Sequence, residues 1–340
     1  MNPRIDETKV FKSTSNLNTV SRRAFMRLFT AAVAVAAGGR RRAGAQEADP
    51  GGSFVQQGRK YHDGDGVVVD YKKAAQLFKS ASDVGSADGQ AWLGMMHLRG
   101  RGVAQDDAKA AELINASAEA GSPAGLRFSG VLHQEGRTVP QDYGKAKEFY
   151  ERAASKGDAV AFGRLGMLHL FGRGVPANVG KAREYLGMGA SGGDPWSKVE
   201  LGMLYLRDHN KSDRAFAFEQ FAQAAEQGNR VGAYRLACAH HFGIGTAKDP
   251  VATLKFVKQS AAKGYPVAQA ALGSLYEKGN MVEKDLQRAY AFYTLASRQG
   301  DKRAASHLRF LARQMTVQEI QNANALADGY RAKNLQSKGL

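Results

Sequence analysis

The sequence predicts an all-α fold, a solenoid in which helix-turn-helix repeats stack one upon the next. The first observation is a glycine that recurs every 35 or 36 residues, at Gly85, Gly121, Gly157, Gly193, Gly228, Gly264 and Gly300. The second is that a column of Tyr or His and a column of Asp or Asn keep the same period. The third is that only 8 prolines occur in 340 residues, as long helical stretches require. A fixed period of this length is the signature of a repeat array.

The first 45 residues have the three parts of an export signal and stand apart from the repeats. A pair of arginines is followed by an apolar run from residue 28 to residue 37 and by a small-x-small cleavage pattern. The residues that carry these features are Ser21, Arg22, Arg23, Phe25, Arg27, Ala43 and Ala45. A membrane span needs roughly 20 apolar residues, so we expect no stable membrane anchor here.

This segment resembles a twin-arginine export signal, although Met26 and Arg27 stand where Leu and Lys are usual. The resemblance implies that the folded chain is exported by the twin-arginine translocase and that cleavage follows Ala45. The mature protein would then be periplasmic. An uncleaved cytoplasmic tail with a chance pair of arginines is the alternative.

The second helix of each repeat, helix B, is predicted to begin after an Asp or Asn. This column reads Asp70, Asp106, Asp142, Asn178, Asp213, Asp249 and Asp285. A side-chain oxygen at this position can accept a hydrogen bond from the free N–H groups of the first helical turn. In repeat three the helix is expected to end before Gly157, which would adopt a left-handed C-cap conformation.

The first helix of each repeat, helix A, is predicted from about Ala159 to Phe171 in repeat four. A glycine within a helix costs roughly 1 kcal/mol relative to alanine, yet one column inside helix A reads Gly58, Gly94, Gly130, Gly166, Gly202, Ala237 and Gly273. About one turn earlier, a second column of small residues reads Gly89, Gly125, Ala161, Ser197, Gly232 and Ala268. We expect the two columns to form one groove into which a neighbouring helix packs.

A Gly-x-Gly loop joins helices A and B in four repeats, and it begins at Gly64, Gly100, Gly172 and Gly243. Repeats three and seven keep only the first glycine of this loop, at Gly136 and Gly279. In repeat five, residues 207–210 replace the loop and are one residue shorter. The array is therefore expected to be least regular near its centre.

Repeat four shows the full core, Leu165-Gly166-Met-Leu-His169-Leu-Phe-Gly172-Arg-Gly174-Val175. With the trailing run from Asp142 to Gly157 of repeat three, this pattern resembles the Sel-one-like repeat, a relative of the tetratricopeptide repeat. The resemblance covers roughly residues 52–301 as seven repeats and implies a right-handed α/α superhelical solenoid. Members of this family are adaptors that hold partner proteins in a concave groove and share no catalytic residues. The resemblance therefore implies a scaffold and not an enzyme.

Residues 302–333 are predicted to form a degenerate eighth repeat and a C-terminal capping helix. Arg309 stands in the glycine column of helix A there, and Thr316 and Glu319 have the spacing of a capping box. A solenoid needs such a cap to cover its last apolar surface. We expect residues 334–340 to form a disordered tail.

Composition argues against several kinds of chemistry. Cys238 is the single cysteine, which excludes an intramolecular disulfide and a cysteine-based metal cluster. Residues 46–340 carry 39 basic and 30 acidic side chains without a basic tract interleaved with aromatics, so we expect no nucleic-acid partner. No nucleophile motif occurs, and we expect no cofactor. A hydrolase acting on cell-wall material or β-lactams is the alternative, although family members linked to β-lactam binding carry a disulfide in each repeat.

A column of histidines is the candidate for a metal site, and it reads Tyr61, His97, His133, His169, Tyr205, His240 and Tyr276. Packed helices lie roughly 8–10 Å apart, so equivalent residues of successive repeats are too far apart to share one zinc ion. The adjacent His240 and His241 point in different directions on a helix. We therefore expect these rings to pack locally and expect no metal.

Helix A also carries the predicted partner-binding face, formed by variable positions seven residues apart and hence on one side of the helix. These positions pair Trp92 with Arg99, Phe128 with Glu135, Arg164 with Phe171, Glu200 with Arg207 and Arg235 with Phe242. Aromatic residues and arginine carry much of the binding energy in protein interfaces. We expect this face to bind a partner protein or peptide. The alternatives are that its aromatics pack between repeats, or that the protein is a structural or regulatory subunit of an envelope complex.

Overall fold

The computed structural model describes residues 49, 51–64, 67, 69–208 and 211–336. The chain divides into two units, 1–48 and 49–340, and all the described helices belong to the second. This described part is entirely helical, with sixteen α-helices, one short 3₁₀ helix and no β-strand. The predicted export signal lies outside the described residues.

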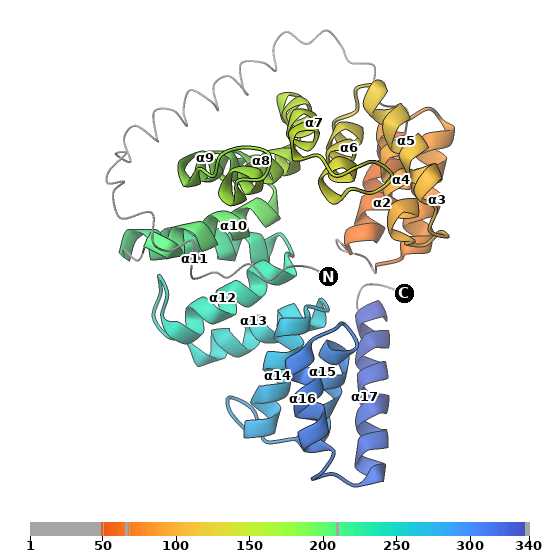
Figure 1. Cartoon of the computed structure of the whole chain (residues 1–340). Coiled ribbons are helices and arrows are strands. Elements are labelled where there is room, and N and C mark those ends of the chain that lie inside the picture. Colours follow the sequence, from red (N-terminus) through yellow and green to blue (C-terminus); the bar gives the residue numbers. More distant parts are fainter. Residues whose placement is uncertain (1–48, 50, 65–66, 68, 209–210, 337–340) are drawn as a thin grey trace. The chain divides into compact units, whose positions relative to one another are not determined.

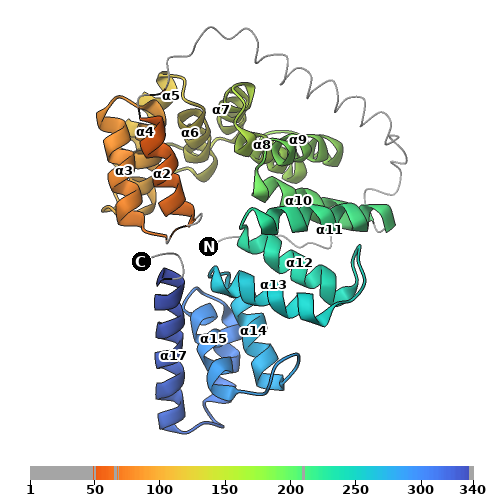
Figure 2. The same cartoon turned by 180° about the vertical axis from the view of Figure 1, so that it is seen from behind.

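The helices alternate between an A series and a B series along the chain. The A series comprises α2 Gly52–Asp63, α4 Ala87–Arg99, α6 Pro123–Glu135, α8 Ala159–Phe171, α10 Pro195–Tyr205, α12 Arg230–Phe242, α14 Pro266–Lys278 and α16 Lys302–Leu311. The B series comprises α3 Tyr71–Asp83, α5 Asp107–Glu119, α7 Tyr143–Ser155, α9 Val179–Ser191, α11 Lys211–Glu226, α13 Pro250–Ala262, α15 Leu286–Ser297 and α17 Val317–Gln336. Each helix A of repeats one to seven packs against helix B of its own repeat, and each helix B packs against helix A of the next (Figures 1 and 2). The predicted all-α solenoid of stacked hairpins is confirmed.

The helix ends follow the predicted capping rules. The Asp142 carboxylate accepts a hydrogen bond from the Lys145 backbone N–H at 2.9 Å. In five other repeats the same bond, from the backbone N–H three residues later, is accepted by a side-chain oxygen of Asp70, Asp106, Asn178, Asp249 or Asp285. At the other end of α7, Gly157 adopts φ +86° and donates its N–H to the Ala154 carbonyl. The Asp158 N–H bonds the Ala153 carbonyl, which completes a Schellman motif.

Repeat five departs from the predicted capping pattern. Asp213 does not precede its helix B, because α11 begins at Lys211 and Asp213 lies in the first turn. In this repeat a 3₁₀ turn, Leu206–Asp208, follows α10 in place of the Gly-x-Gly loop. The connection is therefore shorter, and helix B starts earlier relative to its Asp than it does in the other repeats.

The two columns of small residues contact two different helices, so the prediction of one shared groove was wrong. A Cβ added at Gly130 would lie 2.5 Å from Cε1 of Tyr150, on helix B of the same repeat. A Cβ added at Gly125 would instead lie 2.6 Å from the Ala118 backbone nitrogen, on helix B of the preceding repeat. Each helix A of repeats two to seven is therefore held between two B helices, and each side of it needs its own small residue.

The second glycine of the loop lies against the preceding repeat. Gly102 adopts φ +72°, and a Cβ there would collide with the backbone carbonyl of Tyr71 at the start of α3. Thr138 and Met281 hold the equivalent positions in repeats three and seven and keep positive φ angles of 65° and 61°. The loop therefore keeps its path where the glycine is missing.

The last two described helices, α16 and α17, both pack on α15. The Thr316 N–H bonds the Glu319 carboxylate at 2.7 Å, and the Glu319 N–H bonds the Thr316 hydroxyl at 3.3 Å, which confirms the predicted capping box. The helix that follows packs along α15, where the rings of Tyr330 and Phe292 stack 4.8 Å apart. This helix continues to Gln336, so the disordered tail was predicted to begin too early. The helix extends through residues 334–336 because no Gly or Pro interrupts it there. Residues 337–340 lie outside the described part.

Candidate protein-binding face

Three of the four histidines in the column, His133, His169 and His240, pack on aromatic rings of helix B, whereas the His97 ring bonds the Ala104 carbonyl. His133 stacks on Phe149, with ring centroids 5.5 Å apart and an interplanar angle of 14°. His169 stacks on Tyr185 at 5.4 Å and 10°. In repeat seven, Tyr276 stacks in the same way on Phe292. The predicted local packing of these rings is confirmed, and the described residues contain no group of three His, Cys, Asp or Glu that could hold a metal ion.

Acidification is expected to weaken the fold through these buried rings. Burial lowers the pKa of His133 and His169, whereas a histidine in the unfolded chain has a pKa of about 6.5. Below this value the unfolded state therefore binds more protons than the folded state does. The contribution of the two neutral histidines to the free energy of unfolding is complete above about pH 6.5 and is lost as the pH falls. Urea unfolding at a series of pH values should show this loss, and His169→Tyr should reduce it. An equal loss in the variant would contradict the assignment.

The central positions of the predicted partner-binding face are packed between repeats. The Trp92 ring lies between Phe78, stacked at 5.4 Å, and Phe128, edge-on at 5.2 Å. Phe128 is only 4% exposed and cannot contact a partner, so its inclusion in the face was wrong. The physical reason is that neighbouring A helices contact each other at this level, where an aromatic ring fills the space between α4 and α6.

The same level becomes charged in repeats four to six. Arg164 is half-buried, and its guanidinium lies 5.4 Å from the centre of the Trp196 ring. Glu200 and Arg235 are half-buried at the equivalent positions of α10 and α12. Burial raises the pKa of Glu200, and the charges of Arg235 and Arg207 oppose that rise. Among the described residues, the buried Nε atoms of Arg164 and Arg235 have no hydrogen-bond partner.

The other half of the predicted face, at the C-terminal ends of the A helices, is exposed in repeats four to six. Phe171 is 46% exposed and Phe242 is 63% exposed. Arg207, in the 3₁₀ turn after α10, is also exposed. We call these three residues the helix-A edge. Two of them are large apolar side chains in contact with water, which is the feature that partner surfaces share.

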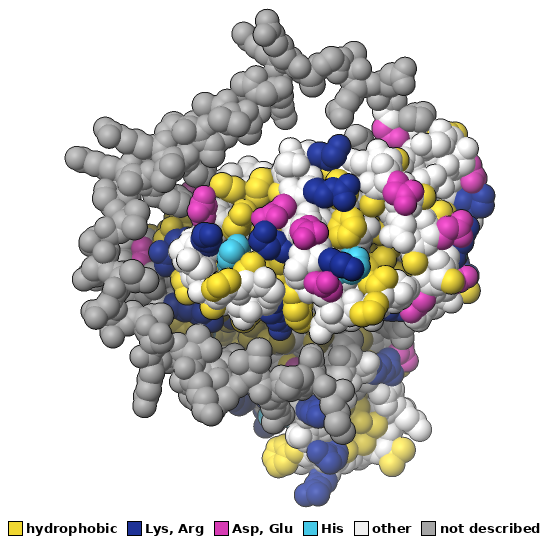
Figure 3. Space-filling view, turned by 45° about the horizontal axis from the view of Figure 1, so that its top comes forward, with side chains coloured by type: hydrophobic (Ala, Val, Ile, Leu, Met, Phe, Trp, Pro, Cys, Tyr) yellow, Lys and Arg dark blue, Asp and Glu magenta, His cyan; other side chains and the backbone are white. Residues whose placement is uncertain are grey.

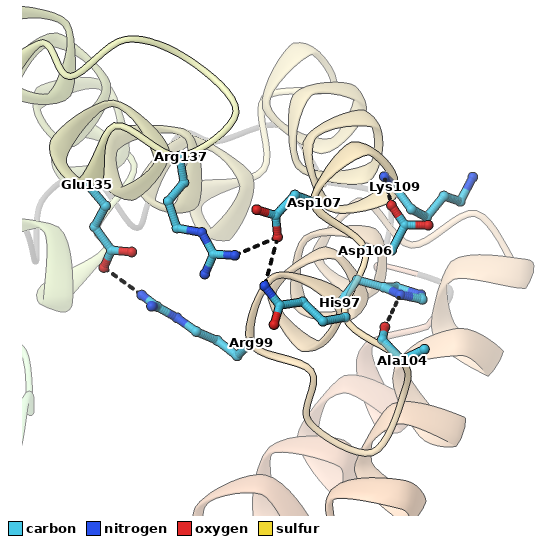
Figure 4. Close-up of polar contacts among 9 residues, drawn as sticks. His97, Arg99, Ala104, Asp106, Asp107, Lys109, Glu135 and Arg137 are labelled. Atoms are coloured by element: carbon cyan, nitrogen blue, oxygen red, sulfur yellow. Dashed lines mark hydrogen bonds and ion pairs between the residues drawn. The ribbon is translucent and has the colours of Figure 1, made fainter.

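In repeats two and three the equivalent positions bind each other. Arg99 forms an ion pair with Glu135 at 2.5 Å, across the boundary between α4 and α6 (Figure 4). Nearby, Arg137 forms a second ion pair with Asp107 at 2.5 Å, and this hydrogen bond lowers the pKa of Asp107. These pairs join neighbouring repeats. On the face shown in Figure 3, Lys and Arg side chains are interspersed with Asp and Glu side chains.

A pocket of about 460 Å³ between α11, α12 and α13 was not predicted. Its apolar lining includes Phe218, Leu236 and Phe256. None of the described helices is both long and apolar enough to cross a membrane.

Comparison with known proteins identifies the family. The Sel1 repeat model matches seven segments, residues 58–86, 87–122, 123–158, 164–194, 198–229, 231–265 and 266–301. The chain belongs to the Sel1 repeat family. Proteins built from Sel1 repeats generally mediate protein–protein interactions and are typically non-catalytic scaffolds.

A solved Sel1 repeat structure resembles the chain in fold. A Sel1 repeat protein from Oxalobacter formigenes is 26% identical, with a TM-score of 0.57 over 72% of this chain and 99% of that one. A protective antigen of uropathogenic Escherichia coli with the same repeat is 24% identical, with a TM-score of 0.41 over 86% of this chain and 71% of that one. The chitin synthase regulator SKT5 of Saccharomyces cerevisiae is 30% identical over 99 residues, which span 28% of this chain and 14% of the regulator.

Proposed function

We propose that the chain is an exported scaffold that binds a partner protein or peptide at the helix-A edge of repeats four to six. The observation that carries this proposal is the exposure of Phe171 and Phe242 at equivalent positions of their repeats. Arg207 stands at the equivalent position of the repeat between them. Aromatic and arginine side chains are the types that contribute most to binding at interfaces.

Repeat stacking supports this function by holding the edge residues on rigid elements. The positions follow one another from α8 to α10 to α12, and each of these helices packs against the next. A surface that is already ordered loses little conformational freedom when a partner binds. A row of equivalent positions along successive repeats suits an extended segment of a partner chain.

The export part of the proposal rests on residues 1–45, whose twin-arginine motif directs a folded chain across the membrane. A repeat protein that is folded before export would reach the periplasm with its binding surface formed. A structural or regulatory subunit of an envelope complex would use the same helix-A edge. One experiment can therefore test the periplasmic location of the chain and the helix-A edge as its binding surface.

A photo-crosslinking amino acid in place of Phe242 tests both parts of the proposal in intact cells. The matched control replaces Val251, which belongs to the same repeat, lies on helix B and is 80% exposed. We expect position 242 to form a discrete adduct in the periplasmic fraction and position 251 to form none. The double substitution Arg22→Lys with Arg23→Lys should abolish the periplasmic adduct. Equal adducts from both positions, or a cytoplasmic chain, would contradict the proposal.

A further inference from the structure

Three arginines in consecutive repeats form no ion pair with a carboxylate of the described residues. They are Arg164 on α8, Arg207 after α10 and Arg235 on α12. No hydrogen bond or ion pair joins their guanidinium groups to any residue that the structure describes. The Arg164 guanidinium lies 5.4 Å from the centre of the Trp196 ring. Each guanidinium has five N–H donors. The Nε atoms of Arg164 and Arg235 are buried, so the terminal nitrogens of these two side chains are the donors left to bind carboxylates.

Four arginines at other repeat boundaries have carboxylate partners. These pairs are Arg99 with Glu135, Arg137 with Asp107, Arg127 with Asp158 and Arg298 with Asp328. The pair of Arg127 and Asp158 is the most buried of them, at a distance of 2.9 Å. At the predicted face positions, therefore, Arg99 of repeat two has a carboxylate partner, whereas the three arginines of repeats four to six form no such pair among the described residues.

Glu200 is the one carboxylate at the predicted face positions of these three repeats. It interacts electrostatically with Arg235 and Arg207, and no hydrogen bond to either is formed within the described part of the chain. One negative charge against three positive charges leaves the surface net positive. The exposed rings of Phe171 and Phe242 lie at the ends of the same helices.

We propose that this surface binds an extended acidic segment of the partner protein, whose carboxylates pair with Arg164, Arg207 and Arg235. Apolar side chains of the segment would pack on Phe171 and Phe242. This inference rests on the proposed scaffold function and names the chemical class of its partner. Arginine pairs with carboxylates in a bidentate manner, which adds geometric specificity to the attraction of opposite charges.

Charge and exposure favour a peptide over a nucleic acid or an anionic membrane. A continuous polyanion would bring its charges close to Glu200 as well as to the arginines, whereas a peptide can place an apolar residue there. The two exposed phenylalanines offer apolar contacts that a phosphate backbone does not use. An acidic segment with interspersed apolar residues matches both features.

Fluorescence anisotropy with the exported chain tests the proposal. The probe is a fluorescein-labelled peptide in which Glu alternates with Leu, and its counterpart carries Gln in place of each Glu. We expect the Glu peptide to bind at least about tenfold more tightly than the Gln peptide, because hydrogen bonds to charged groups are the stronger ones. Added salt should reduce this difference.

Variants with opposite expected effects sharpen the test. Arg207→Gln, at an exposed position that tolerates the change, should weaken binding of the Glu peptide about tenfold. Glu200→Gln removes the competing carboxylate and should tighten binding of the same peptide. Arg99→Gln is the matched control at the equivalent position of repeat two, where Glu135 already occupies the arginine. It should leave the affinity unchanged.

Equal affinity for the Glu and Gln peptides would overturn the proposal, and so would weaker binding by Glu200→Gln. Tight binding of single-stranded DNA or of phosphatidylglycerol vesicles that is lost in Arg207→Gln, without a preference for the Glu peptide, would assign the surface to another class of ligand. The crosslink from position 242 is measured separately. If that adduct forms while the two peptides bind equally, the scaffold function stands and only the acidic class of partner is wrong.

Discussion

Replacing Tyr150 with alanine is expected to lower the free energy of unfolding by about 4 kcal/mol. The Tyr150 side chain is fully buried on α7, and its hydroxyl donates a hydrogen bond to Oε1 of Gln134 at 2.9 Å. Its ring packs directly on the backbone of Gly130 in α6. Removal of the ring would leave a cavity at the centre of repeat three. Tyr150→Phe keeps the ring and removes only the hydrogen bond, so it should cost about 1 kcal/mol.

A double-mutant cycle with Gly130 isolates the contact between the two residues. In the parent, Gly130→Ala should destabilise the protein, because the new methyl group would lie 2.5 Å from Cε1 of Tyr150. In the Tyr150→Ala background the methyl group has room, and the better helix propensity of alanine should stabilise α6 by about 1 kcal/mol. Urea unfolding followed by circular dichroism measures all four proteins. The same sign in both backgrounds would refute the close-approach role of this glycine.

Gly102→Ala is expected to lower the free energy of unfolding by about 3 kcal/mol, the second largest loss after that of Tyr150→Ala. Gly102 has a positive φ of 72°, which disfavours any side chain, and a Cβ at this position would also collide with the Tyr71 carbonyl. That carbonyl belongs to the first turn of α3, so the loop would have to move away from the preceding repeat.

Gly157→Ala is the control for the backbone part of that effect. Gly157 has a similar φ of +86°, but a Cβ there would meet nothing within 4 Å. Only the conformational cost of about 1 kcal/mol should then appear. Thermal and urea unfolding of the two variants should therefore differ by about 2 kcal/mol. Equal losses would mean that the contact of Gly102 with the preceding repeat does not matter for stability.

The capping residues of this protein could be predicted because they act locally. Asp142 and Gly157 affect backbone groups only a few residues away, so their spacing reveals their roles without knowledge of the fold. The prediction failed at Asp213, where the loop before it is shorter and the helix begins earlier. A change in loop length alters the register of the following helix, and a pattern taken from the regular repeats does not contain that change.

The candidate binding face was predicted less completely, because exposure depends on neighbours that are distant in sequence. Trp92 and Phe128 share a helical position with Arg164, yet two of these side chains pack against one another across a repeat boundary. Phe171 and Phe242 share the other position and remain exposed. Helical spacing places residues on one side of a helix, but the adjoining helices determine which end of that side is covered.

Sequence alone determined the repeat length, the order of the helices and the ends of the regular repeats, since a recurring pattern of caps and small residues is sufficient for these. The family followed from the same pattern and was confirmed by the seven matched segments. Only the tertiary structure decided which helix each glycine column contacts, which arginines have carboxylate partners and which aromatics face water. These properties depend on distances between residues about one repeat apart, and stacking of the hairpins sets those distances.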